Sequence, residues 1–203
     1  MWHGSLVSAQ LQRHVLGVTW YEEGGTFRSA HALASDGRVW LVDPFDDAPG
    51  LTAAAELGEV AGVLQLLDRH GRDCESLARR LGVPLLRLPD RAPDTPFAVV
   101  PMISRRLWKE IALWWAAENT LIVAEAVGTA PAFAVGRQAG VHPLLRLTPP
   151  RAQLAPWAPE RLFVGHGKPI ESGASGAISE ALARSRSDIP RLLKALPTLL
   201  RGG

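Results

Sequence analysis

The stretch LLDRHGRDC, residues 66–74, lies between two segments with different hydrophobic patterns. It follows an apolar run, Val60–Leu67, and precedes a short amphipathic run, Glu75–Gly82, after which a second apolar run begins at Val83. Continuous apolar runs of this length are typical of buried strands, and the amphipathic spacing is typical of a helix. The region is therefore predicted to form a strand, a loop, a helix and a second strand, with charged and metal-ligand side-chain types in the loop.

The rest of the chain contains similar signals. Apolar runs predict strands at residues 15–21, 39–42, 97–103, 111–115, 121–124 and 161–164. A short helix is predicted over Ala53–Leu57, where Gly58 would end it. The C-terminal part predicts a helix from about Ala174 to Ser187, a break at Pro190 and a second helix to about Leu200.

The order of elements around residues 66–74 resembles the segment that carries the H-x-H-x-D-H signature of the metallo-β-lactamase superfamily. Laid on that pattern, the two leading histidines correspond to Arg69 and Gly71, the aspartate to Asp73 and the last histidine to Cys74. The loop therefore resembles a metal-binding loop in which part of the ligand set has been replaced.

Three further segments resemble the same superfamily in the same chain order. The segment 31–44 resembles an early hairpin that ends in an aspartate supporting the site, here Asp43. The segment 121–126 resembles a strand that ends in a metal-bridging aspartate, here Glu125, and the segment 163–169 resembles a Gly-His-Gly segment whose histidine, here His166, binds the second metal. The resemblance implies an α+β fold, an αββα sandwich of two mixed sheets face to face with helices on the outer faces, formed as one domain over residues 1–203.

The superfamily usually has another histidine ahead of the bridging carboxylate, in a Gly-His-Thr-Pro-Gly type of turn. Counting back from Ile111 places Arg106 at that position. On this resemblance, Arg69, Gly71 and Arg106 replace the three imidazoles of one metal site. An arginine cannot ligate a cation, because its guanidinium stays protonated and offers only donors. A two-metal hydrolytic centre is therefore not expected.

Two arrangements of the remaining groups are open. In the first, which we favour, the two arginines form ion pairs with the neighbouring carboxylates, and no metal or other cofactor is bound. The protein would then be a ligand-binding or regulatory pseudoenzyme with a pocket for a small anionic molecule. This pocket would consist of Arg69, His70, Asp73, Arg106, Glu125 and His166.

In the second arrangement, a single zinc or iron ion is held by Asp73, Cys74, Glu125 and His166, all of which have acceptable ligand types. Cys74 would lie just before a helix, where the helix N-terminus favours the thiolate. The protein would then be a mononuclear hydrolase acting on an ester, a thioester or a similar small substrate. A third possibility is a scaffold that forms a homodimer through a tryptophan-rich surface and its C-terminal helices.

Several of these residues also have a purely structural interpretation. Asp73 and Cys74 fit the N-cap and first turn of the predicted helix. His31 and His70 fit exposed loop histidines. The seven tryptophans, among them Trp108, fit the core of a sandwich.

The composition is that of an ordinary globular protein, with 203 residues of which 47% are hydrophobic and 21% charged. The net charge is +2 and the basic residues are spread along the chain, so no nucleic-acid-binding surface is expected. The single cysteine fits a reducing compartment. Residues 1–5 lack the pattern of a signal peptide, and no apolar stretch reaches the roughly 18–20 residues needed to span a bilayer. We therefore expect a cytoplasmic protein without membrane contact.

Overall fold

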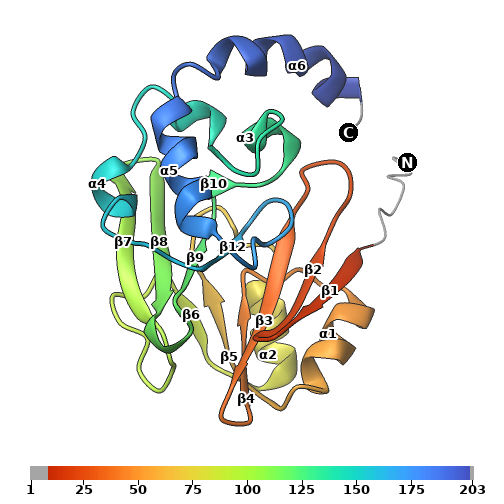
Figure 1. The fold of residues 1–203 in the computed structure, drawn as a ribbon. Helices are drawn as coiled ribbons and strands as arrows, with labels where there is room; N and C mark the ends of the chain where they lie inside the picture. The colour runs from red at the N-terminus through yellow and green to blue at the C-terminus, as the bar shows by residue number, and fades with distance from the viewer. Residues whose placement is uncertain (1–8, 202–203) are drawn as a thin grey trace.

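The computed structural model of the protein describes residues 9–201 and shows two β-sheets packed face to face, with helices on the outer surfaces (Figure 1). This arrangement confirms the α+β fold, an αββα sandwich, that the resemblance implies. The expectation about a signal peptide concerns residues 1–5, which lie outside the described part of the chain.

The first sheet has six strands that follow one another in chain order. The first three pairs of neighbouring strands are antiparallel, whereas the last two pairs are parallel. Parallel neighbours require a crossover, and the two crossovers contain the helices α1 (Ala48–Ala55) and α2 (Cys74–Leu81). The strands are β1 (Gln10–His14), β2 (Gly17–Tyr21), β3 (Ser29–Ser35), β4 (Arg38–Val42), β5 (Glu59–Gln65) and β6 (Leu85–Arg87).

The second sheet has four strands in the order β12-β9-β8-β7, and β12 is parallel to β9 while the other pairs are antiparallel. Its strands are β7 (Ala98–Arg105), β8 (Trp108–Trp115), β9 (Thr120–Val123) and β12 (Arg161–Val164). A small hairpin-like pair, β10 (Val127–Gly128) and β11 (Gly140–Val141), lies apart from both sheets. The remaining elements are η1 (Ala116–Glu118), α3 (Pro131–Ala134), η2 (Pro143–Leu145), α4 (Arg151–Leu154), α5 (Ala174–Arg184) and α6 (Ile189–Arg201).

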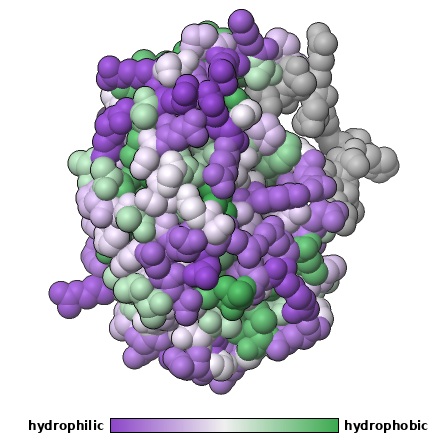
Figure 2. All heavy atoms as spheres, viewed as in Figure 1, coloured by the Kyte–Doolittle hydropathy of each residue, from purple (hydrophilic) through white to green (hydrophobic). Residues whose placement is uncertain are grey.

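Strand β4 is buried on both faces, which explains its uninterrupted apolar sequence. Trp40 and Val42 belong to the core between the two sheets, whereas Val39 and Leu41 belong to a second core beneath α1 and α2. Successive side chains of a strand point to opposite faces, so one apolar run can serve both cores. Hydrophilic side chains dominate the face of the molecule seen in Figure 2.

Several helix boundaries differ from the sequence-based prediction. Helix α1 begins at Ala48 rather than Ala53, because the Asp47 side chain accepts a hydrogen bond from the Gly50 N–H and caps the helix. The predicted break between the two C-terminal helices lies at residues 185–188, since α5 ends at Arg184 and α6 has Pro190 in its first turn, where a proline is tolerated. Helix α2 ends at Leu81, and its C-cap Gly82 adopts a left-handed conformation.

The sandwich places four loops at one edge. The loops after β4, β5, β9 and β12 all follow the carboxyl ends of parallel strands, and together they carry the polar residues described below. Within the described residues, no helix has both the length and the apolar character to cross a bilayer.

Candidate metal-binding site

Three side chains from three of these loops converge at the edge of the sandwich. His70 follows β5, Glu125 follows β9 and His166 follows β12. The Nε2 atoms of His70 and His166 lie 3.3 and 3.4 Å from Oε1 of Glu125, and 3.4 Å from each other. Within residues 9–201 this is the one group of three histidine, cysteine or acidic side chains close enough to share a metal ion.

The second ring nitrogen of each histidine has a partner that can only accept a hydrogen bond. Nδ1 of His70 lies 3.0 Å from Oδ2 of Asp43, and Nδ1 of His166 lies 2.6 Å from the carbonyl oxygen of Thr26. Each Nδ1 must therefore carry the hydrogen and donate it. In the neutral ring, Nε2 is then an unprotonated lone-pair donor directed at Glu125, which is the arrangement found around metal-binding histidines.

The electrostatics of the cluster also favour a positive charge at its centre. Burial alone would raise the pKa of Glu125, but the interactions with the His166 and His70 side chains outweigh it and hold this pKa well below its usual range. Burial and the charge of Arg72 lower the pKa of His70, yet Asp43 and Glu125 together raise it above the ordinary value. The two carboxylates therefore stabilise a cation, whether a proton on His70 or a metal ion.

The donor set fits a divalent metal ion. Two imidazole nitrogens and one glutamate oxygen form a known zinc ligand set that leaves one position open. Donors at about 2.0–2.1 Å from a tetrahedral ion lie about 3.3–3.4 Å apart, which matches the three distances between these atoms.

Two arginines flank the cluster. The Arg72 guanidinium donates hydrogen bonds to the carbonyl oxygens of Ser29 (2.6 Å), Asp43 (2.7 Å) and Gly165 (2.9 Å), and its Nη2 lies 3.4 Å from Nε2 of His70. Arg69 donates to Oε2 of Glu125 at 3.3 Å and lies over the Trp108 ring, 4.1 Å from its centroid. Each guanidinium is therefore fixed by several partners.

The backbone is strained at two points beside the cluster. Asp43 and Arg72 have φ angles of +44° and +36°, in the left-handed region that side chains with a Cβ rarely adopt. The Asp43 N–H donates to the Leu64 carbonyl, and its Oδ1 accepts the Leu66 N–H. These bonds hold Asp43 in the strained conformation that aims its carboxylate at His70.

Glu110, a fully buried residue of β8, positions Glu125. Its Oε1 accepts the backbone N–H groups of Ala124, Glu125 and Ala126 at 3.2, 2.9 and 2.9 Å, while its Oε2 accepts the indole N–H of Trp108. Burial raises the pKa of Glu110 to about 7. The turn after β9 is thus fastened to β8 through one carboxylate.

A cavity of about 290 Å³ opens onto the cluster. Glu125, His166 and a further histidine, His142, lie on its polar side. The rest of its wall is largely apolar and includes Phe27, Ala130, Ala132, Phe133 and Pro143. Burial lowers the pKa of His142 to about 4.

The structure brings together four of the side chains that the sequence suggested for the site. Arg69, His70, Glu125 and His166 meet at the cluster. The expectation that His70 and His31 are exposed loop histidines is wrong, since they are 5% and 2% exposed. His70 rather than Gly71 faces Glu125 and His166, so the loop is shifted by one residue relative to the alignment with the H-x-H-x-D-H pattern.

The structure does not bring three other suggested residues to the cluster. The Asp73 carboxylate accepts the Asp46 N–H at 2.8 Å. Cys74 is buried against the carbonyl oxygens of Pro44 and His70, and burial raises the pKa of its thiol to about 12, which opposes formation of the thiolate. Arg106 is exposed in the turn between β7 and β8.

Sequence reasoning missed Arg72, Glu110 and His142. Arg72 stands within the quoted loop, but only the fold shows that its guanidinium points inward. The signal for Glu110 is an acidic residue within the apolar strand Trp108–Trp115, which requires a buried partner. His142 follows β11 and belongs to no recognisable motif.

Solved structures with a similar fold include several metallo-β-lactamases. The chain matches a DIM-1 metallo-β-lactamase at a TM-score of 0.58 and 11% identity, over 89% of this chain and 97% of that one. It matches TMB-1 at 0.55 and 12% (89% and 98% covered) and VMB-1 at 0.59 and 8% (90% and 99% covered). No protein-family model and no curated protein sequence matches the chain. The structural similarity establishes the fold, and sequence identities this low leave the activity open.

Proposed function

Because the chain has the metallo-β-lactamase fold, we propose that it is a hydrolase with one divalent cation, zinc or iron, held by His70, Glu125 and His166. The proposed substrate is a small ester or thioester with an apolar acyl group. The metal set differs from the one suggested by the sequence, since Asp73 and Cys74 are engaged elsewhere.

The observation that carries this proposal is the direction of the ring hydrogens. Asp43 and Thr26 each accept a hydrogen from Nδ1, so two lone pairs and one carboxylate face a common point at mutual distances of 3.3–3.4 Å. A cation between the members of this set, either a metal ion or a proton, would stabilise it. When bound there, a divalent ion supplies Lewis acidity and a water of lowered pKa.

The chain's own residues supply the rest of the site. Arg69 holds Oε2 of Glu125 and keeps Oε1 turned toward the histidines. Arg72 provides a fixed positive charge beside His70, in a position where its carbonyl partners prevent it from moving away. The apolar wall formed by Phe27 and Phe133 suits a small acyl group and excludes water from it.

One observation favours a second candidate, a metal-free protein that binds a small anion. The charges of Arg69 and Arg72 balance those of Glu125 and Asp43, so the cluster is neutral without an ion when its histidines are neutral. The Nη2 atom of Arg72 also approaches the lone pair of His70. Their separation of 3.4 Å exceeds that of an ordinary hydrogen bond, however, so this contact satisfies His70 poorly.

Metal analysis of the protein, purified without chelator and supplied with zinc or iron, tests the proposal. We expect about one equivalent per chain in the wild type, by the ligand count of a mononuclear site. The variant His166→Gln should lose the metal, whereas Cys74→Ser and Asp73→Asn should keep it. A metal-free wild type would favour the anion-binding candidate. Retention by His166→Gln together with loss by Cys74→Ser would overturn the ligand assignment.

A further inference from the structure

We infer that His142 donates its Nε2–H to the reacting oxygen of the substrate, as a neutral hydrogen-bond donor beside the proposed metal site. This inference rests on the proposed function and adds a catalytic residue to it. It is carried by the orientation, the packing and the free hydrogen-bonding capacity of one imidazole.

The tautomer of His142 is opposite to that of the other two histidines at the site. Its Nδ1 lies 3.1 Å from the backbone nitrogen of Leu144, at the start of η2. An amide N–H can only donate, so Nδ1 accepts and carries no hydrogen. The ring is therefore neutral, and its hydrogen is on Nε2. Two histidines present lone pairs to the cluster, and the third presents a proton.

Aromatic neighbours fix the orientation of the His142 ring. It packs edge-to-face against Trp108, with centroids 4.7 Å apart, and against Phe133, with centroids 5.2 Å apart. Phe133 in turn stacks on His166, with centroids 5.5 Å apart. The donor is thus held rigidly relative to a proposed metal ligand, as preorganised electrostatic stabilisation requires.

The Nε2–H of His142 is not committed to a protein acceptor. Its nearest carboxylate oxygen, Oε2 of Glu125, lies 3.8 Å away, beyond hydrogen-bonding distance, and this oxygen already accepts from Arg69. Among the side chains that the structure describes, no other acceptor for this hydrogen is found. The group lines the cavity, and 17% of the side-chain surface is exposed there. A half-buried donor without a protein acceptor that lines a cavity is a position for a ligand oxygen.

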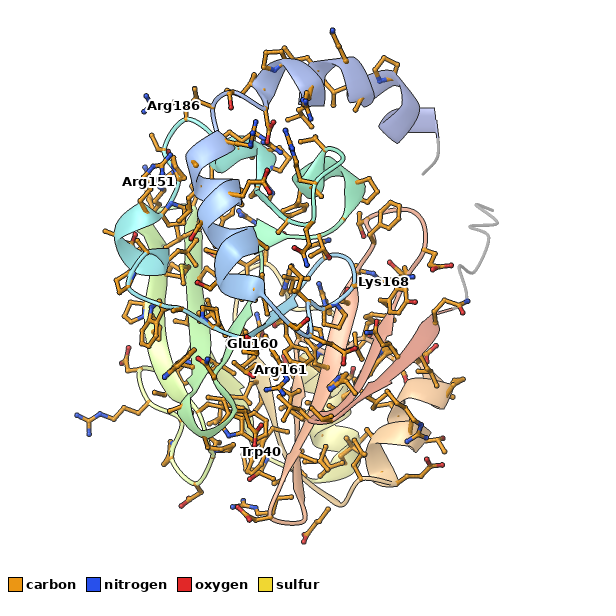
Figure 3. All side chains as sticks on the ribbon, viewed as in Figure 1. Trp40, Arg151, Glu160, Arg161, Lys168 and Arg186 are labelled. Carbon is orange, nitrogen blue, oxygen red and sulfur yellow. The ribbon has the colours of Figure 1, made fainter. Side chains whose placement is uncertain are left out.

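The lining of the cavity indicates which substrate oxygen would accept the hydrogen bond from His142. Its apolar wall, which includes Phe27 and Ala130, matches an acyl chain, and the same two residues also line a neighbouring cavity of about 260 Å³. The second cavity extends to Lys168, on the loop after β12 (Figure 3). A carbonyl group with an apolar acyl chain in the first cavity would place its oxygen within reach of Nε2 of His142, with the leaving group toward the second cavity.

The tautomer can be tested by NMR on zinc-loaded protein labelled with ¹⁵N-histidine, in which the variant His142→Phe identifies the His142 signals. We expect a hydrogen on Nε2 and none on Nδ1. Methylphosphonate, a tetrahedral anion that resembles the intermediate of ester hydrolysis, should shift the Nε2–H signal. Its affinity should fall about tenfold or more in His142→Phe and recover in His142→Gln, which retains a donor. The opposite tautomer, equal affinity in all three proteins, or an absence of binding to the wild type would overturn the inference.

Kinetics with p-nitrophenyl acetate separate this inference from the proposed function. His142→Phe keeps the aromatic packing but removes the donor, so kcat should fall roughly 10²–10³-fold with little change in KM. His142→Gln should restore part of kcat. A wild type without metal and without esterase activity would refute the proposed function, and the same NMR measurement on the metal-free protein would still decide the tautomer. A His142→Phe protein that retains both zinc and wild-type kcat would refute the inference alone.

Discussion

Asp43 determines what His70 can do at the site, although Asp43 itself is not one of the three converging groups. Its carboxylate accepts the Nδ1 hydrogen of His70, and its Oδ1 is held by the Leu66 N–H. The carboxylate thereby fixes the tautomer and the orientation of the ring. His142 shows the same principle with the opposite result, because the Leu144 N–H reverses the tautomer.

The substitution Asp43→Asn should therefore lower the affinity for the metal ion. The amide is uncharged and supports the Nδ1–H tautomer less well, so zinc affinity should fall about 10–100-fold. Competition with a chromogenic chelator measures this change. Asp73→Asn is the matched control, because its carboxylate caps the Asp46 N–H away from the cluster. Equal losses in the two variants would show that Asp43 has no specific role.

At the scale of elements, the site depends on how closely the loops after β9 and β12 approach each other. A Cβ added at Gly165 would lie 2.4 Å from the Ala124 carbonyl oxygen and 2.8 Å from Cε1 of His70. The two loops can therefore approach each other only with glycine at this position. The same approach brings His166 and Glu125 together.

Gly165→Ala should consequently reduce both stability and metal affinity. Forcing the Cβ into this space should lower the free energy of unfolding by about 1–3 kcal/mol, measured by urea denaturation. Gly176→Ala is the control, since a Cβ in that turn of α5 meets no atom within 4 Å. The account would be wrong here if Gly165→Ala had the stability and zinc affinity of the control.

Sequence reasoning was most successful for elements with strong hydrophobic periodicity. The strands around Trp40, Leu121 and Leu162 are found where apolar runs predicted them, because burial on both faces leaves few alternatives. Loops have no such periodicity. The shift from Gly71 to His70 depends on the strained turn at Arg72, and the position of Arg106 depends on the length of the β7–β8 turn. Neither the shift in the loop nor the position of Arg106 can be predicted by counting residues along a single sequence.

At the scale of the whole molecule, a buried chain of hydrogen bonds connects the two sheets. His31 of β3 donates from Nε2 to the Val164 carbonyl of β12 at 2.9 Å, and its Nδ1 lies 2.8 Å from the Thr19 hydroxyl. The Thr19 hydroxyl lies 3.2 Å from Nε2 of His14. Burial lowers the pKa of His14 to about 4 and that of His31 to about 3, so both rings are neutral in the folded protein.

This network predicts a loss of stability in mild acid. Below pH 6.5 the unfolded chain binds a proton at His14 and another at His31. In the folded protein His14 binds its proton only near pH 4, and His31 only near pH 3. Stability present above pH 6.5 should therefore fall toward pH 4, by up to about 1.4 kcal/mol per pH unit for each histidine. Glu110 acts in the opposite direction, because its pKa is raised to about 7 and folding takes up a proton there.

The contribution of His14 is best isolated by comparing variants. In His14→Gln, which keeps a donor for Thr19, the free energy of unfolding should depend less steeply on pH between 6.5 and 5. The slope should differ from that of the wild type by up to about 1.4 kcal/mol per pH unit. Urea denaturation at several pH values measures both slopes, and identical slopes would contradict the assignment of a neutral, buried His14.

The central claim is that one divalent ion binds to Nε2 of His70, Nε2 of His166 and Oε1 of Glu125. Anomalous diffraction at the zinc absorption edge, from crystals of zinc-loaded protein, tests it most directly. The account predicts one strong peak about 2.0–2.2 Å from all three atoms. A peak beside Cys74 and Asp73, or an Arg72 guanidinium in the centre of the cluster with no peak in zinc-soaked crystals, would contradict it.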